Sequence, residues 1–156
     1  MPDPILTSAR ALLRTARDDL RAAVDGLPAD ALNWRPAGDD TNSIAVLTSH
    51  SLLSARMWLS VAVAAPLPDR DRDAEFGVTA ASADELLALA GGLFDECLDL
   101  TSKDRTVDWG SIRKHWDSGR EFDILAPWAL IHALEHLREH IGHIGLTRQL
   151  WQARGG

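Results

Sequence analysis

The stretch from Ala126 to Trp151 carries four of the chain's six histidines, at steps of four, four and three residues. On a helix that turns roughly 100° per residue, these four side chains fall within an arc of about 80°. Apolar residues at 130, 133, 134, 137, 141, 144 and 151 form a face beside them. The spacing therefore predicts a long helix that holds a stripe of imidazoles at the margin of a buried seam. The stripe consists of His132, His136, His140 and His143.

Three earlier segments also repeat apolar residues with the period of a helix, and turn residues separate them. We expect helices at about 3–25, 42–64, 82–101 and 123–153, with Asp123 and Pro127 opening the last one. The predicted fold is all-α, a single four-helix bundle domain over residues 1–156. A long connector of about twenty residues joins the third and fourth helices, and its pattern assigns neither a strand pair nor a helical turn.

Charge and composition exclude several classes of protein. The formal net charge is −7 and the pI is about 5.2, so the surface would repel a phosphate backbone and we expect no nucleic-acid partner. The first residues do not resemble a signal peptide, and the most apolar segment is too short to span a membrane. We therefore expect a cytoplasmic protein with no membrane partner.

Two local features are given simple structural interpretations. The single cysteine, Cys97, shares a helical face with leucines, so it is interpreted as a small core residue. The mixed-charge run 69–73 is interpreted as a solvated loop.

The histidine stripe suggests a metal site, because imidazoles one helical turn apart can share an ion. Both His132 with His136 and His136 with His140 make such a pair. His50 lies along the middle of the apolar face of the second helix, where an isolated imidazole would be costly, and it is the natural third ligand. Imidazole ligands suit zinc, nickel or iron, and zinc is the default expectation.

Other polar residues near the site receive more ordinary interpretations. Glu135 and Glu139 point away from the stripe and are expected in solvent. Arg56 lies off the face of His50 and is expected in solvent or paired with an acid. His115, in the long connector, is expected to be a surface histidine.

The fourth coordination position separates two functions. If a protein atom such as His143 or His115 fills it, a structural site is favoured. If it opens onto a pocket lined by tryptophans of the connectors, an enzyme is favoured. The candidate tryptophans are Trp34, Trp109 and Trp116. The simplest alternative is a helical interaction domain without a metal.

Two motifs resemble the DinB/YfiT-like family. Residues 31–50 contain a Trp-x-Pro connector, an Asn-Ser-Ile helix start and a histidine, and residues 132–142 read His-x-x-x-His-x-x-x-His-x-Gly. The resemblance implies a four-helix bundle that holds a divalent metal through His50, His136 and His140. In that family, the histidine that corresponds to His132 is often present without being a ligand. Many members have glutamine after the glycine, whereas this chain has His143, either beside the ligands, facing a substrate, or as a competing ligand.

The resemblance also implies a range of activities. Characterised members include thiol S-transferases and an isomerase that use low-molecular-weight thiols such as mycothiol or bacillithiol. We therefore expect a bacterial divalent-metal-dependent transferase, hydrolase or isomerase that acts on a small-molecule substrate, with His143 or His132 as proton carrier. The alternative is a non-catalytic metal-binding or small-ligand-binding module of a stress response. A homodimer is expected in either case, with a seam on the first and third helices.

Overall fold

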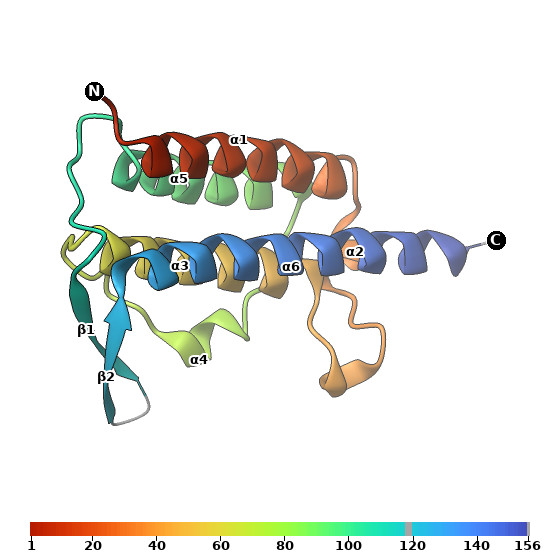
Figure 1. Cartoon of the computed structure of the whole chain (residues 1–156). Coiled ribbons are helices and arrows are strands. Elements are labelled where there is room, and N and C mark those ends of the chain that lie inside the picture. The colour runs from red at the N-terminus through yellow and green to blue at the C-terminus, as the bar shows by residue number, and fades with distance from the viewer. Residues whose placement is uncertain (118–119, 156) are drawn as a thin grey trace.

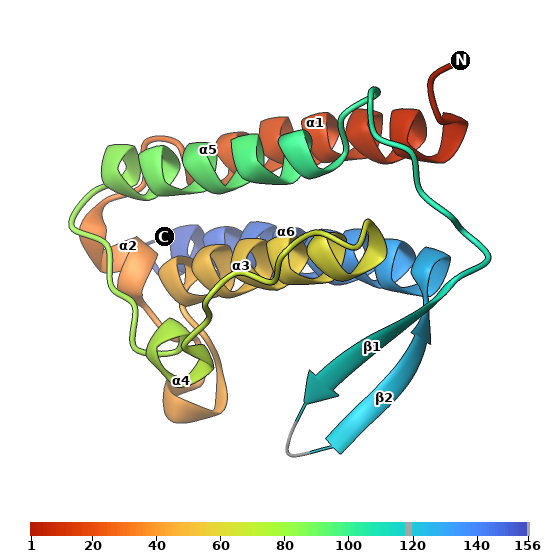
Figure 2. The same ribbon diagram turned by 90° about the vertical axis from the view of Figure 1, so that its left-hand side faces the viewer.

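The computed structural model describes residues 1–117 and 120–155, without the side chains of residues 116 and 117. Its frame consists of four long helices, α1 (Pro4–Val24), α3 (Ile44–Ala62), α5 (Ala83–Leu100) and α6 (Ala126–Ala153). Figures 1 and 2 show two layers, with α1 beside α5 and α3 beside α6. Contacts between α3 and α5 and between α1 and α6 join the layers. The prediction of a mostly helical chain is confirmed.

Helix α1 shows how the sequence places these elements. The Asp3 carboxylate caps its N-terminus by accepting hydrogen bonds from the backbone N–H groups of Ile5 and Leu6, at 2.8 and 3.2 Å. Its buried residues recur every three or four positions, so that one face packs inward. They are Leu6, Ala9, Leu13, Ala16, Leu20 and Val24.

Helix α3 is buried on nearly all sides. It lies between α5 on one side and α6 on another, and the short helix α4 (Arg72–Glu75) contacts it as well. Polar residues such as Thr48, Ser49 and His50 are consequently buried together with the aliphatic ones. A helix without a polar face gives no indication in its sequence of which direction each side chain takes.

The predicted connector contains a β-hairpin, which corrects the all-α prediction to a helical fold with a small sheet. Strands β1 (Ile112–Asp117) and β2 (Arg120–Leu125) pair antiparallel, with Lys114 opposite Asp123. The prediction that the last helix begins at 123 was therefore wrong, because residues 123–125 belong to β2. The other predicted helix ends lie within two residues of those observed.

Two shorter helices, α2 (Ala29–Asn33) and the 3-10 turn η1 (Gly38–Asp40), lie in the connector between α1 and α3. The hairpin and α4 both lie on the side of the α3–α6 layer that faces away from α1 and α5 (Figures 1 and 2). None of the helices in the described part of the chain has both the length and the apolar character that a bilayer crossing requires.

Candidate metal centre

Three histidines from two helices meet on the outer face of the α3–α6 layer. His50 comes from α3, His136 and His140 come from α6, and one ring nitrogen of each lies within 4.8 Å of the others. The Nε2 atoms of His136 and His140 are 3.2 Å apart. Two ligands of a tetrahedral zinc ion, with bonds of about 2.0–2.1 Å, are separated by roughly 3.3 Å. The observed separation therefore fits two imidazoles that share one ion.

His50 is 8% exposed, but it does not point into the layer between α3 and α5. Its Nδ1 lies 2.9 Å from Oε2 of Glu75 on α4, and its ring lies 4.9 Å from that of Phe76. The sequence analysis placed His50 on the apolar face of its helix, and the residue is buried; its ring lies against α4 and α6. Because the N–H at Nδ1 donates a hydrogen bond to the carboxylate, Nε2 keeps the lone pair that can bind a metal.

Glu75 is the important residue that the sequence analysis missed. Its side chain is only 2% exposed. The guanidinium of Arg70 donates hydrogen bonds to both carboxylate oxygens, from Nε at 2.5 Å and from Nη2 at 2.9 Å. The interpretation of the run 69–73 as a solvated loop was wrong for Arg70, whose side chain is 15% exposed, and for residues 72 and 73, which belong to α4. A carboxylate behind a ligand histidine fixes the tautomer and the orientation of the ring, and the guanidinium supplies the charge that lets the carboxylate stay buried.

His143 contacts a candidate ligand and does not join the group of three. Its Nδ1 lies 3.3 Å from Nδ1 of His140, while Nε2 of His140 faces His136. One of the two Nδ1 atoms donates to the other, and a metal-bound His140 would be the donor. The structure thus places His143 behind the site, on its exposed side.

His132 lies further along the same stripe. It stacks on Trp128 at 4.9 Å with planes 19° apart, and its Nδ1 lies 3.6 Å from Glu135. His132 lines a cavity of about 220 Å³ together with His50 and His136. It is therefore outside the ligand group but beside it.

The environment of the two helix-α6 ligands keeps them neutral. Burial, followed by the neighbouring His140 and His50, lowers the pKa of His136 to about 4. Burial, followed by His50 and His143, also lowers the pKa of His140. Neutral imidazole is the form that binds metals, so the site is prepared for an ion at neutral pH.

The predicted positions of the other polar residues near the site were partly right. Glu135 and Glu139 are exposed, as expected, and Arg56 forms an ion pair with Glu96 at 2.7 Å. The prediction of a surface position for His115 was wrong: the residue is 8% exposed and its ring lies 4.5 Å from that of Trp58. The pairing of β1 with β2 turns this side chain toward the helices, which a loop assignment could not foresee.

The tryptophans that surround the site differ from those predicted. Trp34 packs on Trp151, and the Trp109 indole donates to Asp3 at 2.7 Å, so neither lines the histidine site. The side chain of Trp116 lies outside the described residues. Trp58 and Trp128 form the aromatic wall instead.

Cavities lie on both sides of the three histidines. The cavity beside His50 and His136 also contacts Trp58, Arg72 and His132. A second one, of about 390 Å³, contacts His140 and His143 and reaches the segment 36–42. The site therefore offers room for a small molecule next to the candidate ligands.

Comparison with known proteins supports one relationship. The family model described as the DinB superfamily matches residues 12–154, which covers most of the chain and includes all three histidines. No curated protein matches the chain.

Proposed function

The chain belongs to the DinB superfamily, and we propose that it is a divalent-metal-dependent enzyme that activates a small thiol or water. The observation that carries the proposal is the meeting of His50, His136 and His140, whose ring nitrogens lie within 4.8 Å of one another. Membership gives the scaffold, whereas the reaction has to be argued from the site.

The donor set suits the metal. Three neutral imidazoles favour zinc, with nickel and iron as alternatives, and leave at least one position for an exogenous ligand. Within the described residues, no fourth histidine, cysteine or carboxylate joins the group, which favours an open site over a closed structural one. A divalent ion held there would lower the pKa of a bound thiol or water, so that the nucleophile forms near neutral pH.

The chain's own residues hold and serve that centre. Glu75 fixes His50 through Nδ1, and His143 contacts Nδ1 of His140, so two of the three rings are oriented from behind. His132 lines the cavity beside His50 and His136, where it can move a proton to or from a reacting molecule. His143 is the second candidate for proton transfer, on the opposite side of the centre.

Thiol transfer is the reaction that we favour. The thiol, of the mycothiol or bacillithiol class, would lose its proton to His132, and its sulfur would form a bond to an electrophilic carbon of a small substrate. In an addition, His132 would return the proton to the adjacent carbon; in a substitution, the leaving group would depart with the bonding electron pair. Attack by water in place of the thiol would give hydrolysis. A homodimer and a cytoplasmic location remain predictions.

Metal analysis of protein purified without a histidine tag tests the site. We expect about one equivalent of divalent metal in the wild type, and its loss in His50→Ala and in His136→Ala. His132→Ala is the matched control on the same stripe and should retain the metal. A folded wild type that takes up neither zinc, nickel nor iron would overturn the proposal.

Thiol activation needs a separate measurement. Cobalt-substituted protein should develop a sulfur-to-cobalt charge-transfer band when bacillithiol or mycothiol is added, and the band should be absent in His50→Ala. If cobalt binds but neither thiol produces the band, thiol chemistry is excluded, and activation of water or the non-catalytic metal-binding module becomes the better description.

A further inference from the structure

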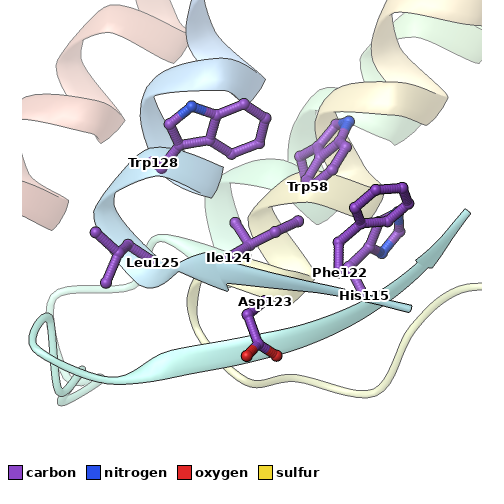
Figure 3. A pocket seen from close by; sticks show the side chains of 7 residues that line it. All are labelled: Trp58, His115, Phe122, Asp123, Ile124, Leu125 and Trp128. Atoms are coloured by element: carbon purple, nitrogen blue, oxygen red, sulfur yellow. The ribbon is translucent and has the colours of Figure 1, made fainter. Parts of the chain in front are cut away.

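A cavity of about 520 Å³ lies between the β-hairpin and the ends of α3 and α6. This volume lies within the range of roughly 300–1,000 Å³ that is typical of ligand pockets. Figure 3 shows the side chains that line it, from both strands, from α3 and from α6. They are Trp58, His115, Phe122, Asp123, Ile124, Leu125 and Trp128.

The walls of this hairpin cavity are aromatic and largely uncharged. The rings of Trp58 and Trp128 lie 5.5 Å apart at 76°, and His115 packs on Trp58. Trp128 is 50% exposed and Phe122 is 43% exposed. The carboxylate of Asp123 points away from the rings (Figure 3) and pairs with Lys114 at 2.6 Å on the other face of the hairpin. Exposed ring faces arranged in this way favour a planar apolar ligand.

The hairpin cavity adjoins the cavity at the histidine site, because Trp58 and His115 line both. The cavity at the histidine site contacts two arginines, Arg70 and Arg72, and no carboxylate of the described residues lines it. The charge of Arg70 is balanced by the buried Glu75. Arg72 takes part in none of the ion pairs within the described part of the chain, and its positive charge therefore remains available at the cavity.

We propose that the two cavities form one substrate site for a small molecule that joins a planar aromatic group to an anionic group such as a carboxylate. The aromatic group lies under the hairpin against Trp58 and Trp128. The anionic group lies past Trp58, near Arg72 and the three histidines. This proposal rests on the proposed function for the identity of the reacting centre, but the two residues that its test changes, Trp128 and Arg72, lie outside the ligand group.

Charge strengthens the assignment of an anion. A bound divalent ion would add two positive charges beside Arg72, so a negative group would be attracted from both sides. At the hairpin end, Lys114 is paired on the outer face with Glu121 and Asp123. Arg113 donates to the Ala62 carbonyl, and Arg120 lies over the Phe122 ring at 5.9 Å, but neither arginine lines the cavity. The polarity of the site therefore orients the ligand, with its charged end toward the metal.

Calorimetric titration with three probes tests the proposal. The probes are 2-naphthoate, which has both groups, 2-naphthalenemethanol, which has only the planar group, and acetate, which has only the charge. We expect zinc-loaded wild type to bind 2-naphthoate more tightly than either of the others. Trp128→Ala should weaken both naphthalene probes by roughly tenfold. Arg72→Gln should weaken 2-naphthoate by roughly fivefold and leave 2-naphthalenemethanol unchanged.

Matched variants control for general effects. Ile131→Ala removes a residue of α6 that is 63% exposed and lines neither cavity, and Arg14→Gln removes an exposed charge of α1. Both should bind all three probes like the wild type. If 2-naphthoate does not bind to the zinc-loaded wild type, or if Trp128→Ala binds it normally, the proposal is wrong. If Trp128→Ala and Ile131→Ala both convert a dimer to a monomer, a second copy covers this face and the proposal is likewise wrong.

The same titrations separate this proposal from the metal proposal. Metal-free wild type should still bind 2-naphthalenemethanol, and Trp128→Ala should weaken that binding. A chain that takes up no metal yet shows this pattern would keep the hairpin cavity as a ligand site and refute only the metal-dependent reaction. A protein that takes up zinc but binds neither naphthalene probe would refute the hairpin cavity as a ligand site and leave the metal proposal intact.

Discussion

Replacing Glu75 with glutamine should weaken zinc binding by about ten- to a hundredfold without unfolding the protein. The substitution preserves the shape of the side chain and removes its charge. In the structure Oε2 of Glu75 lies 2.9 Å from Nδ1 of His50, and both carboxylate oxygens accept from Arg70. The amide oxygen of glutamine can still accept a bond, but its NH₂ group must then face another donor.

The magnitude follows from the bonds that the change removes. A buried hydrogen bond to a charged group contributes about 1.5–3 kcal/mol, which corresponds to a factor of roughly ten to a hundred in Kd. Glu75→Ala is a less specific test, because it would leave the guanidinium of Arg70, whose side chain is only 15% exposed, without its partner. Breaking such a buried pair costs about 3–5 kcal/mol and would destabilise the fold as well as the site.

The assay is competition for zinc between metal-free protein and a chromophoric chelator at fixed pH. Glu135→Gln is the matched control, because that carboxylate also faces a histidine, at 3.6 Å, but is 69% exposed and outside the three-histidine group. It should change the affinity by less than roughly twofold. A folded Glu75→Gln variant that binds zinc as tightly as the wild type would refute the argument that this carboxylate orients His50.

Three further results are expected. His143→Ala should lower zinc affinity by about tenfold, because Nδ1 of His140 loses its contact, whereas His132→Ala should leave it unchanged; equal effects in the same chelator competition would contradict the assignment. The metal-free protein should lose stability to urea as the pH falls from about 6.5 to about 4. The reason is that His136 in the unfolded chain takes up a proton that folded His136, with its pKa of about 4, does not bind. A free energy of unfolding that does not change with pH, or that changes equally in His136→Gln, would contradict this. Burial raises the pKa of the Cys97 thiol to about 12, so the folded protein should resist labelling by maleimide at pH 8 while the urea-unfolded chain reacts fully; rapid labelling of the folded form would show that the thiol is accessible.

The helical elements could be predicted because their information is local. In α1 the Asp3 cap, the following proline and an apolar period of three to four residues all indicate the same element. The hairpin was not predicted, because Glu121 to Leu125 alternate too briefly to outweigh the helix-start signals at Asp123 and Pro127. Pairing with β1, which lies across a turn, determines the conformation of these residues.

The candidate ligands were predictable for a related reason. Spacing alone places both His136 with His140 and His132 with His136 one turn apart on α6. The family motif favours His136 with His140. The structure brings His136 and His140 together with His50, in agreement with the motif. Spacing could not indicate Glu75, because it lies 25 residues from His50 in the chain and on a different element.

The sequence by itself determined the helical class of this protein, the positions of its long helices and the stripe of imidazoles on the last one, because helical periodicity and capping act over a few residues. The tertiary structure alone decided that His50 faces α4, that Glu75 and Arg70 are buried behind it, and that the hairpin encloses an aromatic cavity beside the site. These features depend on which faces of α3 and α6 the connecting segments cover. A connecting segment takes its place by packing and charge pairing with distant residues, and a local sequence pattern does not record those partners.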